Sequence, residues 1–276
     1  MRERNNLLTD IKPISYTIVF EIKKQTKKII FFTVFTLLII FLQNVVLQTL
    51  ITINLLPLTQ ADFFINGLGF FNLIELFSTC LFFSGVICEE YSTNTGYILF
   101  PKINKYELII GKYLGNLIIV ILLTTLFYSF LGLFGFYYYG SQINIRLFYS
   151  YGIALLHIIA LSSFVTFFSS FMKSVNLTII STVLLLLIGF SIIDLIVTLV
   201  GAGNVEPLYS ITYLGNLITT ILNETFPDPR YIEFTIRNIT TGTWLTPSIE
   251  MGITLMIIYI VLYFILGAVF FKRRQL

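Results

Sequence analysis

The chain has 276 residues, of which 57% are hydrophobic and only 11% are charged, and its mean hydropathy is +0.90. A water-soluble fold cannot cover that much apolar surface, so the composition excludes an ordinary soluble protein and indicates a polytopic membrane protein. The formal net charge of +3 follows from the membrane topology derived below and gives no reason to expect a nucleic-acid partner.

The first 28 residues form a polar, basic segment. Ile11, Ile14, Ile18 and Ile22 recur at helical spacing among lysines, which predicts an amphipathic elbow helix in the cytoplasmic interface of the membrane. A merely solvated basic leader is the alternative. Because the first apolar run begins only near Ile29, we expect no cleaved signal peptide.

Six apolar segments follow the elbow. A helix needs about 20 mainly apolar residues to cross a hydrocarbon core about 30 Å thick. The runs lack the alternation of transmembrane strands, which favours helices. The segments span residues 29–49, 67–87, 114–137, 148–171, 177–200 and 249–271. We therefore predict an all-α integral membrane protein with six transmembrane helices in a single transmembrane domain, residues 1–276.

Lysines and arginines set the orientation of these spans, because positively charged flanks stay in the cytoplasm. Fourteen fall on one side of the membrane, and only Arg146, Arg230 and Arg237 fall on the other. We therefore expect a multi-pass protein of the cell membrane with both termini cytoplasmic. Its parts are an elbow segment (1–28), spans one to five (29–201), an extracellular loop (202–246), and span six with a cytoplasmic tail (247–276).

The extracellular loop has structure of its own. Its stretch "PLYSITYLGNLITTIL" is apolar but only sixteen residues long, which is too short to cross and indicates a re-entrant or interfacial helix before span six. The stretch "YIEFTIRNIT" alternates and predicts one short strand. Asn223 and Asn238 begin glycosylation sequons, which permit an external location without establishing modification.

Residues capable of chemistry are few. His157, the only histidine, lies inside the fourth span and is either a hydrogen-bonded bundle residue or part of a pathway. Gly111-Lys112 resembles the end of a phosphate-binding loop, but Tyr106 and Tyr113 stand where such a loop needs glycine and serine or threonine. We therefore expect no catalytic residue, metal site, cofactor or ATP site in this chain, and no enzyme activity of its own.

The two cysteines are not expected to form a disulfide. Cys80 and Cys88 lie eight residues apart on the second span, which is about 12 Å along a helix.

Three carboxylates lie in or at the spans. Glu75 shares a helical face with Asn72 and Thr79 in the second span, and a buried carboxylate needs a partner or a water-filled path. Asp194 lies in the outer part of the fifth span, where it either lines a pathway or reaches toward the interface. Glu250 is the acid of a helix start with Thr246 as cap and Pro247 as first helical residue. Our pathway candidates are Glu75, Asn72 and Asp194.

The longest cytoplasmic segment between two spans is "CEEYSTNTGYILFPKINKYELIIGKY", residues 88–113. Gly96 is expected to stop the helix that leaves span two, and Pro101 is expected to start the next one. The length exceeds that of the "MKSVN" connection, which favours a docking element over an ordinary turn.

The order of residues in this segment resembles permease subunits of the type-2 ATP-binding-cassette (ABC) transporters. The matching residues are Glu89-Glu90, Gly96, Ile98-Leu99, Pro101, Lys105 and Gly111-Lys112. The basic elbow, six spans, cytoplasmic termini and re-entrant segment fit the same family. The chain departs from it at Tyr97 and Lys102, where the family often has threonine and serine-arginine.

The resemblance implies an exporter in which two permease subunits, identical or related, form the pathway in the lipid bilayer. Two copies of a separate ATPase subunit would bind ATP and Mg and dock on a coupling helix, Glu90 to Pro101. Ile98, Leu99 and Phe100 would supply apolar contacts to the ATPase.

Charged residues around the coupling helix have implied roles as well. Glu89 and Glu90 would pair with basic groups on the ATPase or on the elbow helix. Lys105 and Lys112 would anchor the next helix at the level of the lipid phosphates. Two other classes stay open: a membrane-embedded enzyme, against which the scattered polar residues argue, and a non-transporting scaffold or sensor. The substrate is not specified by the sequence.

Overall fold

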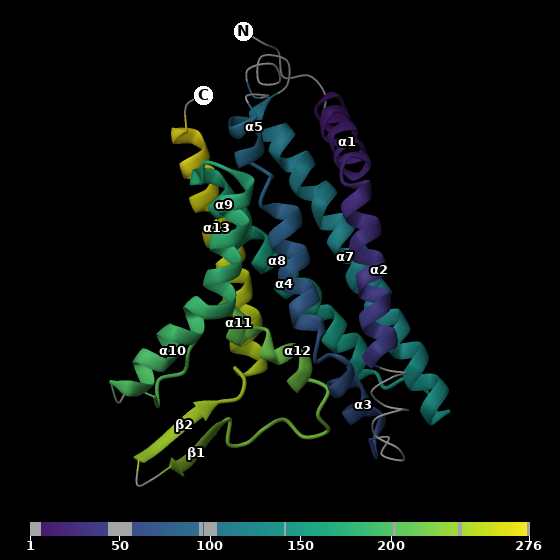
Figure 1. Cartoon of the computed structure of the whole chain (residues 1–276), viewed down its shortest axis with the longest axis vertical. Helices are drawn as coiled ribbons and strands as arrows, with labels where there is room; N and C mark the ends of the chain where they lie inside the picture. The colour runs from purple at the N-terminus through teal and green to yellow at the C-terminus, as the bar shows by residue number, and fades with distance from the viewer. Residues whose placement is uncertain are drawn as a thin grey trace.

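The structure, a computed structural model, describes residues 7–43, 57–93, 96, 104–140, 142–200, 203–236 and 239–274. Long helices run side by side along the long axis of the molecule (Figure 1). The start of α1 (Leu7–Lys24) and the end of α13 (Ile249–Arg273) lie at one end, and the two strands lie at the opposite end.

Five helices in the described part of the chain are long and apolar enough to cross a membrane. They are Gln60–Phe83, formed by α3 (Gln60–Gly67) and α4 (Phe71–Phe83), α7 (Lys105–Tyr139), α8 (Arg146–Phe171), Val175–Leu199, and α13. The protein is therefore a mainly helical, multi-pass membrane protein, as predicted. The first predicted span is described only in part: α2 (Thr26–Phe41) is helical and residues 42 and 43 continue it as a π turn. Residues 44–49 of the prediction lie outside the described residues.

The elbow segment is helical, as predicted, and it packs along α7. Thr17 lies against Gly111, where an added Cβ would stand 2.6 Å from the Thr17 Cβ, and Ile18 lies against Gly115. Glycine at these two positions therefore lets the backbones of α1 and α7 approach closely. The outer face of α1 exposes Tyr16 and Phe20, so the helix has apolar residues on both faces.

Two of the spans are interrupted at glycines. α3 and α4 are separated by the "LGF" turn, where Leu68 N–H donates to the carbonyls of Phe64 and Ile65. The fifth span consists of α9 (Val175–Leu184), a π turn η2 (Leu185–Gly189) and α10 (Phe190–Leu199). π turns of this kind are frequent at functional sites, and this one borders the cavity described below.

α8 is the centre of the bundle. It packs against α13, α4, α7 and α9, and against the short helix α12 (Asn216–Thr220). Its buried face includes the small residues Ala154, Ala160, Ser162 and Ser163, and residues of this kind let neighbouring helices approach. Cys80 and Cys88 are both buried and free, as predicted.

The segment predicted to be extracellular, residues 202–246, differs from the prediction in two ways. The expected single helix is two one-turn helices, α11 (Ile211–Leu214) and α12, broken at Gly215. The expected single strand is an antiparallel hairpin of β1 (Tyr231–Ile236) and β2 (Ile239–Trp244), so the chain is not purely helical. Alternation was visible only in the first strand, because "TTGTW" in β2 lacks an apolar period. Asn223 lies in the loop after α12, and Asn238 lies outside the described residues.

The start of α13 is also displaced from the prediction. Ser248 is the N-cap residue and Pro247 precedes the helix, whereas the Thr246 hydroxyl donates to the Pro247 carbonyl and caps nothing. Glu250 lies in the first turn, where an acid is favourable.

Candidate functional site

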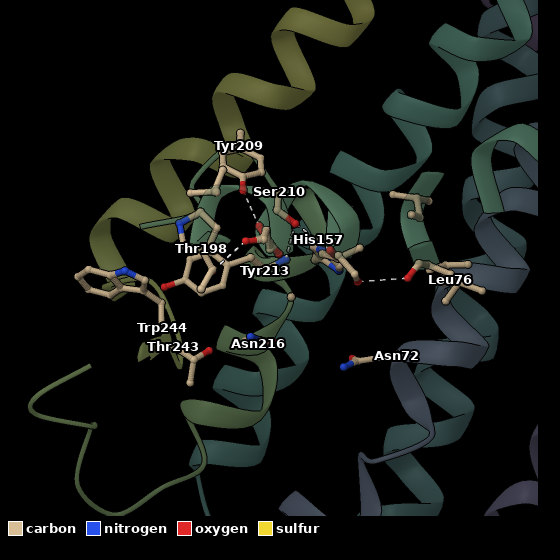
Figure 2. Close-up of a pocket in the computed structure, with 18 of the residues that line it drawn as sticks. Asn72, Leu76, His157, Thr198, Tyr209, Ser210, Tyr213, Asn216, Thr243 and Trp244 are labelled. Carbon is tan, nitrogen blue, oxygen red and sulfur yellow. Dashed lines mark hydrogen bonds between the residues drawn. The ribbon is translucent and has the colours of Figure 1, made fainter. Parts of the chain in front are cut away.

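A cavity of about 450 Å³ lies between α4, α8, the η2–α10 segment, the α11–α12 pair and β2. All three pathway candidates, Asn72, Glu75 and Asp194, line it, together with His157. Figure 2 shows His157 and Tyr213 near its centre, with Asn72 on the side away from Trp244. Thr79, which the sequence placed on the face of Glu75, is buried and is not among the lining residues. The cavity is at the end of the molecule that carries the hairpin.

Glu75 and His157 form a buried pair in the wall of the cavity. The Nδ1 of His157 lies 2.8 Å from the Oε1 of Glu75, and its Nε2 lies 3.0 Å from the carbonyl oxygen of Ile211. A carbonyl only accepts, so Nε2 must carry a proton, and the short Nδ1–Oε1 contact needs a second proton between the two atoms. The pair is therefore electrically neutral overall, whichever of the two atoms holds that proton.

The position of His157 depends on the break between α11 and α12. An added Cβ on Gly215 would stand 2.9 Å from the Cε1 of His157. The glycine thus lets the imidazole lie against the backbone and reach the Ile211 carbonyl. Through this contact and through Glu75, His157 on α8 joins α4 to α11.

Asp194 lies on the α10 side of the cavity. Its Oδ1 accepts a hydrogen bond of 2.5 Å from the hydroxyl of Tyr209. Burial raises the pKa of Tyr209 to about 12, and the hydrogen bond to the Asp194 carboxylate acts in the same direction. Within the described residues, Asp194 makes no ion pair.

The hairpin side of the cavity is aromatic. Tyr213 and Trp244 line it, and the Tyr213 hydroxyl donates to Glu206 at 3.0 Å. Arg230 pairs with the same glutamate at 2.9 Å and lies over the Trp244 ring at 5.6 Å. The indole Nε1 of Trp244 is buried and has no hydrogen-bond partner among the described residues.

A second group of polar side chains lies at the opposite end of the molecule, around α5 (Cys88–Ser92). Glu89 binds Lys24 of α1 at 2.5 Å and Lys112 of α7 at 3.4 Å. Glu90 forms an ion pair with Lys112, and both side chains are buried. The sequence left two partners open for Glu89, the ATPase and the elbow helix. In the structure Glu89 pairs with the elbow helix.

The environment of Glu89 favours its charged form. Burial alone raises the pKa of this carboxyl, but the hydrogen bond from Lys24 and the charge of Lys112 outweigh burial, so the pKa lies below its ordinary value.

Lys112 was predicted to reach the lipid phosphates, and this prediction is wrong. Its exposed fraction is 3%, because two glutamates on α5 compensate its charge inside the protein. Lys105, the first residue of α7, is exposed.

Two further contacts fasten α5. The backbone N–H groups of Ile87 and Cys88 donate to the hydroxyl of Ser169 on α8 at 3.1 and 2.9 Å, and that hydroxyl donates to the Ser84 carbonyl at 2.7 Å. The guanidinium of Arg274, just after α13, lies 4.2 Å from the ring centroid of Tyr91 and donates to the Ser170 carbonyl at 3.1 Å.

The coupling helix predicted for Glu90 to Pro101 is described only at its start. α5 ends at Ser92, where the hydroxyls of Ser92 and Thr93 donate to the Glu89 carbonyl. Gly96 was predicted to stop the helix, but α5 ends before it, and Gly96 is itself helical and buried. The predicted docking residues Ile98, Leu99, Phe100 and Pro101 lie outside the described residues.

In the part of the chain that the structure describes, no group of three or more histidine, cysteine, aspartate or glutamate residues could hold a metal ion. No protein-family model matches the sequence, and no curated protein matches it either. The function must therefore be argued from the two groups of residues described above.

Proposed function

We propose that this chain is the membrane-spanning permease subunit of an ATP-driven ABC transporter of the type-2 family, working as an exporter with a separate ATPase subunit. The observation that carries the proposal is the attachment of α5. This helix has five residues, yet its segment is bound to α1, α7, α8 and the residue after α13. A short helix held in this way moves together with the spans, as a segment that transmits force from an ATPase must.

The proposed topology has six spans, with α2 as the first and both termini in the cytoplasm of the cell. The distribution of lysine and arginine supports it, and so does the position of α1 and the end of α13 at one end of the molecule (Figure 1). The exposed rings of Tyr16 and Phe20 on α1 suit a helix at the cytoplasmic interface.

The cavity is the proposed part of the translocation pathway, since it collects the polar residues of otherwise apolar spans. Two permease subunits, identical or related, would complete the pathway, and α10 and α13 expose many apolar side chains for lipid or for the second subunit. ATP and Mg would bind to two ATPase subunits at the α5 end.

The test is recovery of the partner. The chain is coexpressed with candidate ATPases that carry Walker motifs, taken from the genes next to its own, and is purified through a tag on the permease. Bound ATPase and ATP hydrolysis are then measured. Leu99→Ala with Phe100→Ala should weaken binding of the ATPase at least about thirtyfold and so lower its recovery, since one large anchor contributes about 2 kcal/mol at an interface. Glu250→Gln at the other end is the control. If the wild-type chain binds no ATPase, a scaffold or sensor becomes the better assignment.

A further inference from the structure

We infer that the cavity binds an organic cation that carries hydrophobic groups, with Asp194 as its counter-ion. The inference begins from the charges around the cavity. Glu75 and His157 form a neutral pair, and Glu206 is paired with Arg230. Asp194 is the carboxylate of this region that has no positively charged partner in either pair.

The described lining of the cavity contains no lysine and no arginine. Its single basic residue, His157, uses both ring nitrogens for hydrogen bonds. An anionic ligand would therefore meet no free positive charge and would lie near the Asp194 carboxylate. A cation would gain the charge interaction that Asp194 lacks among the described residues.

The rest of the lining favours an organic cation over a metal ion. No described cluster of acidic, histidine or cysteine ligands is large enough for a metal. Tyr209, Tyr213 and Trp244 line the cavity, and aromatic rings attract organic cations that have lost water. Leucines and valines from α4, α8 and α10 complete the walls, so a charged group with apolar substituents matches the lining.

Hydrogen-bonding atoms remain for the ligand. The side-chain amide of Asn72 lies exposed at the side of the cavity away from Trp244. The volume of about 450 Å³ is in the range of about 300–1,000 Å³ that small-molecule sites occupy. That the bound cation is also the exported cargo rests on the function proposed above.

The experiment uses two probes of the same shape and opposite charge, tetraphenylphosphonium and tetraphenylborate. Binding is measured by equilibrium dialysis on the full chain in phosphatidylcholine liposomes, with protein-free liposomes subtracted. Trp244 is the only tryptophan in the chain, so quenching of its emission reports occupancy of the cavity directly. We expect saturable binding of the phosphonium with quenching, and no saturable binding of the borate.

Two variants locate the site. Asp194→Asn, which still accepts the Tyr209 hydrogen bond, should weaken phosphonium binding about tenfold or more. Glu233→Gln on the exposed face of β1 should retain phosphonium binding. Thermal unfolding of each variant checks that it is folded. Equal binding by wild type and a folded Asp194→Asn, or equal binding of the borate, overturns the inference.

The outcome is separable from that of the transporter test, because binding is measured without an ATPase. A chain that binds its ATPase but no phosphonium would keep the proposed function and lose the cation site. A chain that binds phosphonium through Asp194 but no ATPase would keep the site and lose the transporter.

Discussion

Glu90 on α5 and Lys112 on α7 form an ion pair in which neither side chain reaches solvent: their exposed fractions are 4% and 3%. Breaking such a pair by removing one partner typically costs about 3–5 kcal/mol, because the other charge stays buried. Replacing both partners by apolar residues of similar size is often neutral. The pair therefore makes α5 depend on α7.

Glu90→Gln should accordingly lower the thermal unfolding temperature of the purified protein strongly, although Glu89 at 3.4 Å from Lys112 offsets part of the loss. The double variant Glu90→Gln with Lys112→Met should recover much of it. A double variant no more stable than Glu90→Gln alone would show that the loss comes from the glutamine and not from the unpaired lysine.

The attachment of Glu89 predicts a dependence on pH. Its pKa is lowered in the folded protein, so its pairing stabilises the fold above the ordinary glutamate pKa of about 4.3. That stabilisation is lost as the pH falls through the lowered value. The difference in unfolding temperature between wild type and Glu89→Gln should be constant near neutral pH and should vanish on acidification. A difference that grows toward acid would contradict the assignment.

The neutral Glu75–His157 pair predicts which substitution is tolerated. In Glu75→Gln the amide N–H donates to the Nδ1 of a neutral His157, whose Nε2 still donates to Ile211. Glu75→Leu leaves Nδ1 without a partner, at a cost of about 1–3 kcal/mol for a buried group. We expect near wild-type unfolding temperature for glutamine and a clear decrease for leucine. Equal decreases in unfolding temperature for the two variants would show that His157 needs a charged carboxylate as its partner.

The contact between α1 and α7 can be tested with matched glycine substitutions. Gly111→Ala places a Cβ 2.6 Å from that of Thr17, and overpacking of this kind costs about 1–3 kcal/mol. Gly152→Ala is the control, because it also lies within a helix but meets no atom within 4 Å; it should leave stability unchanged or raise it slightly. The unfolding temperatures of the two variants are compared. Equal temperatures would contradict a close contact between α1 and α7 at Gly111.

The topology can be tested by labelling. Lys272 in the last turn of α13 and Glu233 on β1 are both exposed. Single cysteines are introduced at these two positions in a chain whose two buried cysteines have been replaced. In intact cells an impermeant thiol reagent should label position 233 and not position 272. Labelling of position 272 from outside would reverse the proposed orientation.

Much of the helical framework could be predicted, because long apolar runs in a membrane have few alternatives to a helix. The same reasoning found Asn72, Glu75 and Asp194, since a polar residue in an apolar span needs a partner or a cavity. What the sequence does not contain is the distance between spans. His157 and Glu75 are 82 residues apart, and only packing of α4 against α8 shows that they meet.

The errors have physical causes as well. Lys112 was assigned to the lipid phosphates because it stands at the boundary of an apolar run, and hydropathy does not register that Glu90 lies beside it. The packing of α1 on α7 was not predicted, although the sequence contains a signal for it. Gly111 and Gly115 are small residues one turn apart, and such a pair marks the face of α7 that another helix covers. The second strand of the hairpin needs β1 as its neighbour and has little strand signal of its own.

The contact between Arg274 and Tyr91 limits the order in which the contacts of α5 can form during synthesis. Arg274 follows Tyr91 by 183 residues, so the ribosome has synthesised nearly the whole described chain before this contact can form. During synthesis α5 can already pair with Lys24 and Lys112, and then with Ser169, but it gains the guanidinium only after α13 has emerged and inserted. A nascent or truncated chain therefore carries an α5 segment without its contact to Arg274, and the end of the molecule that holds α5 is completed only when α13 is in place.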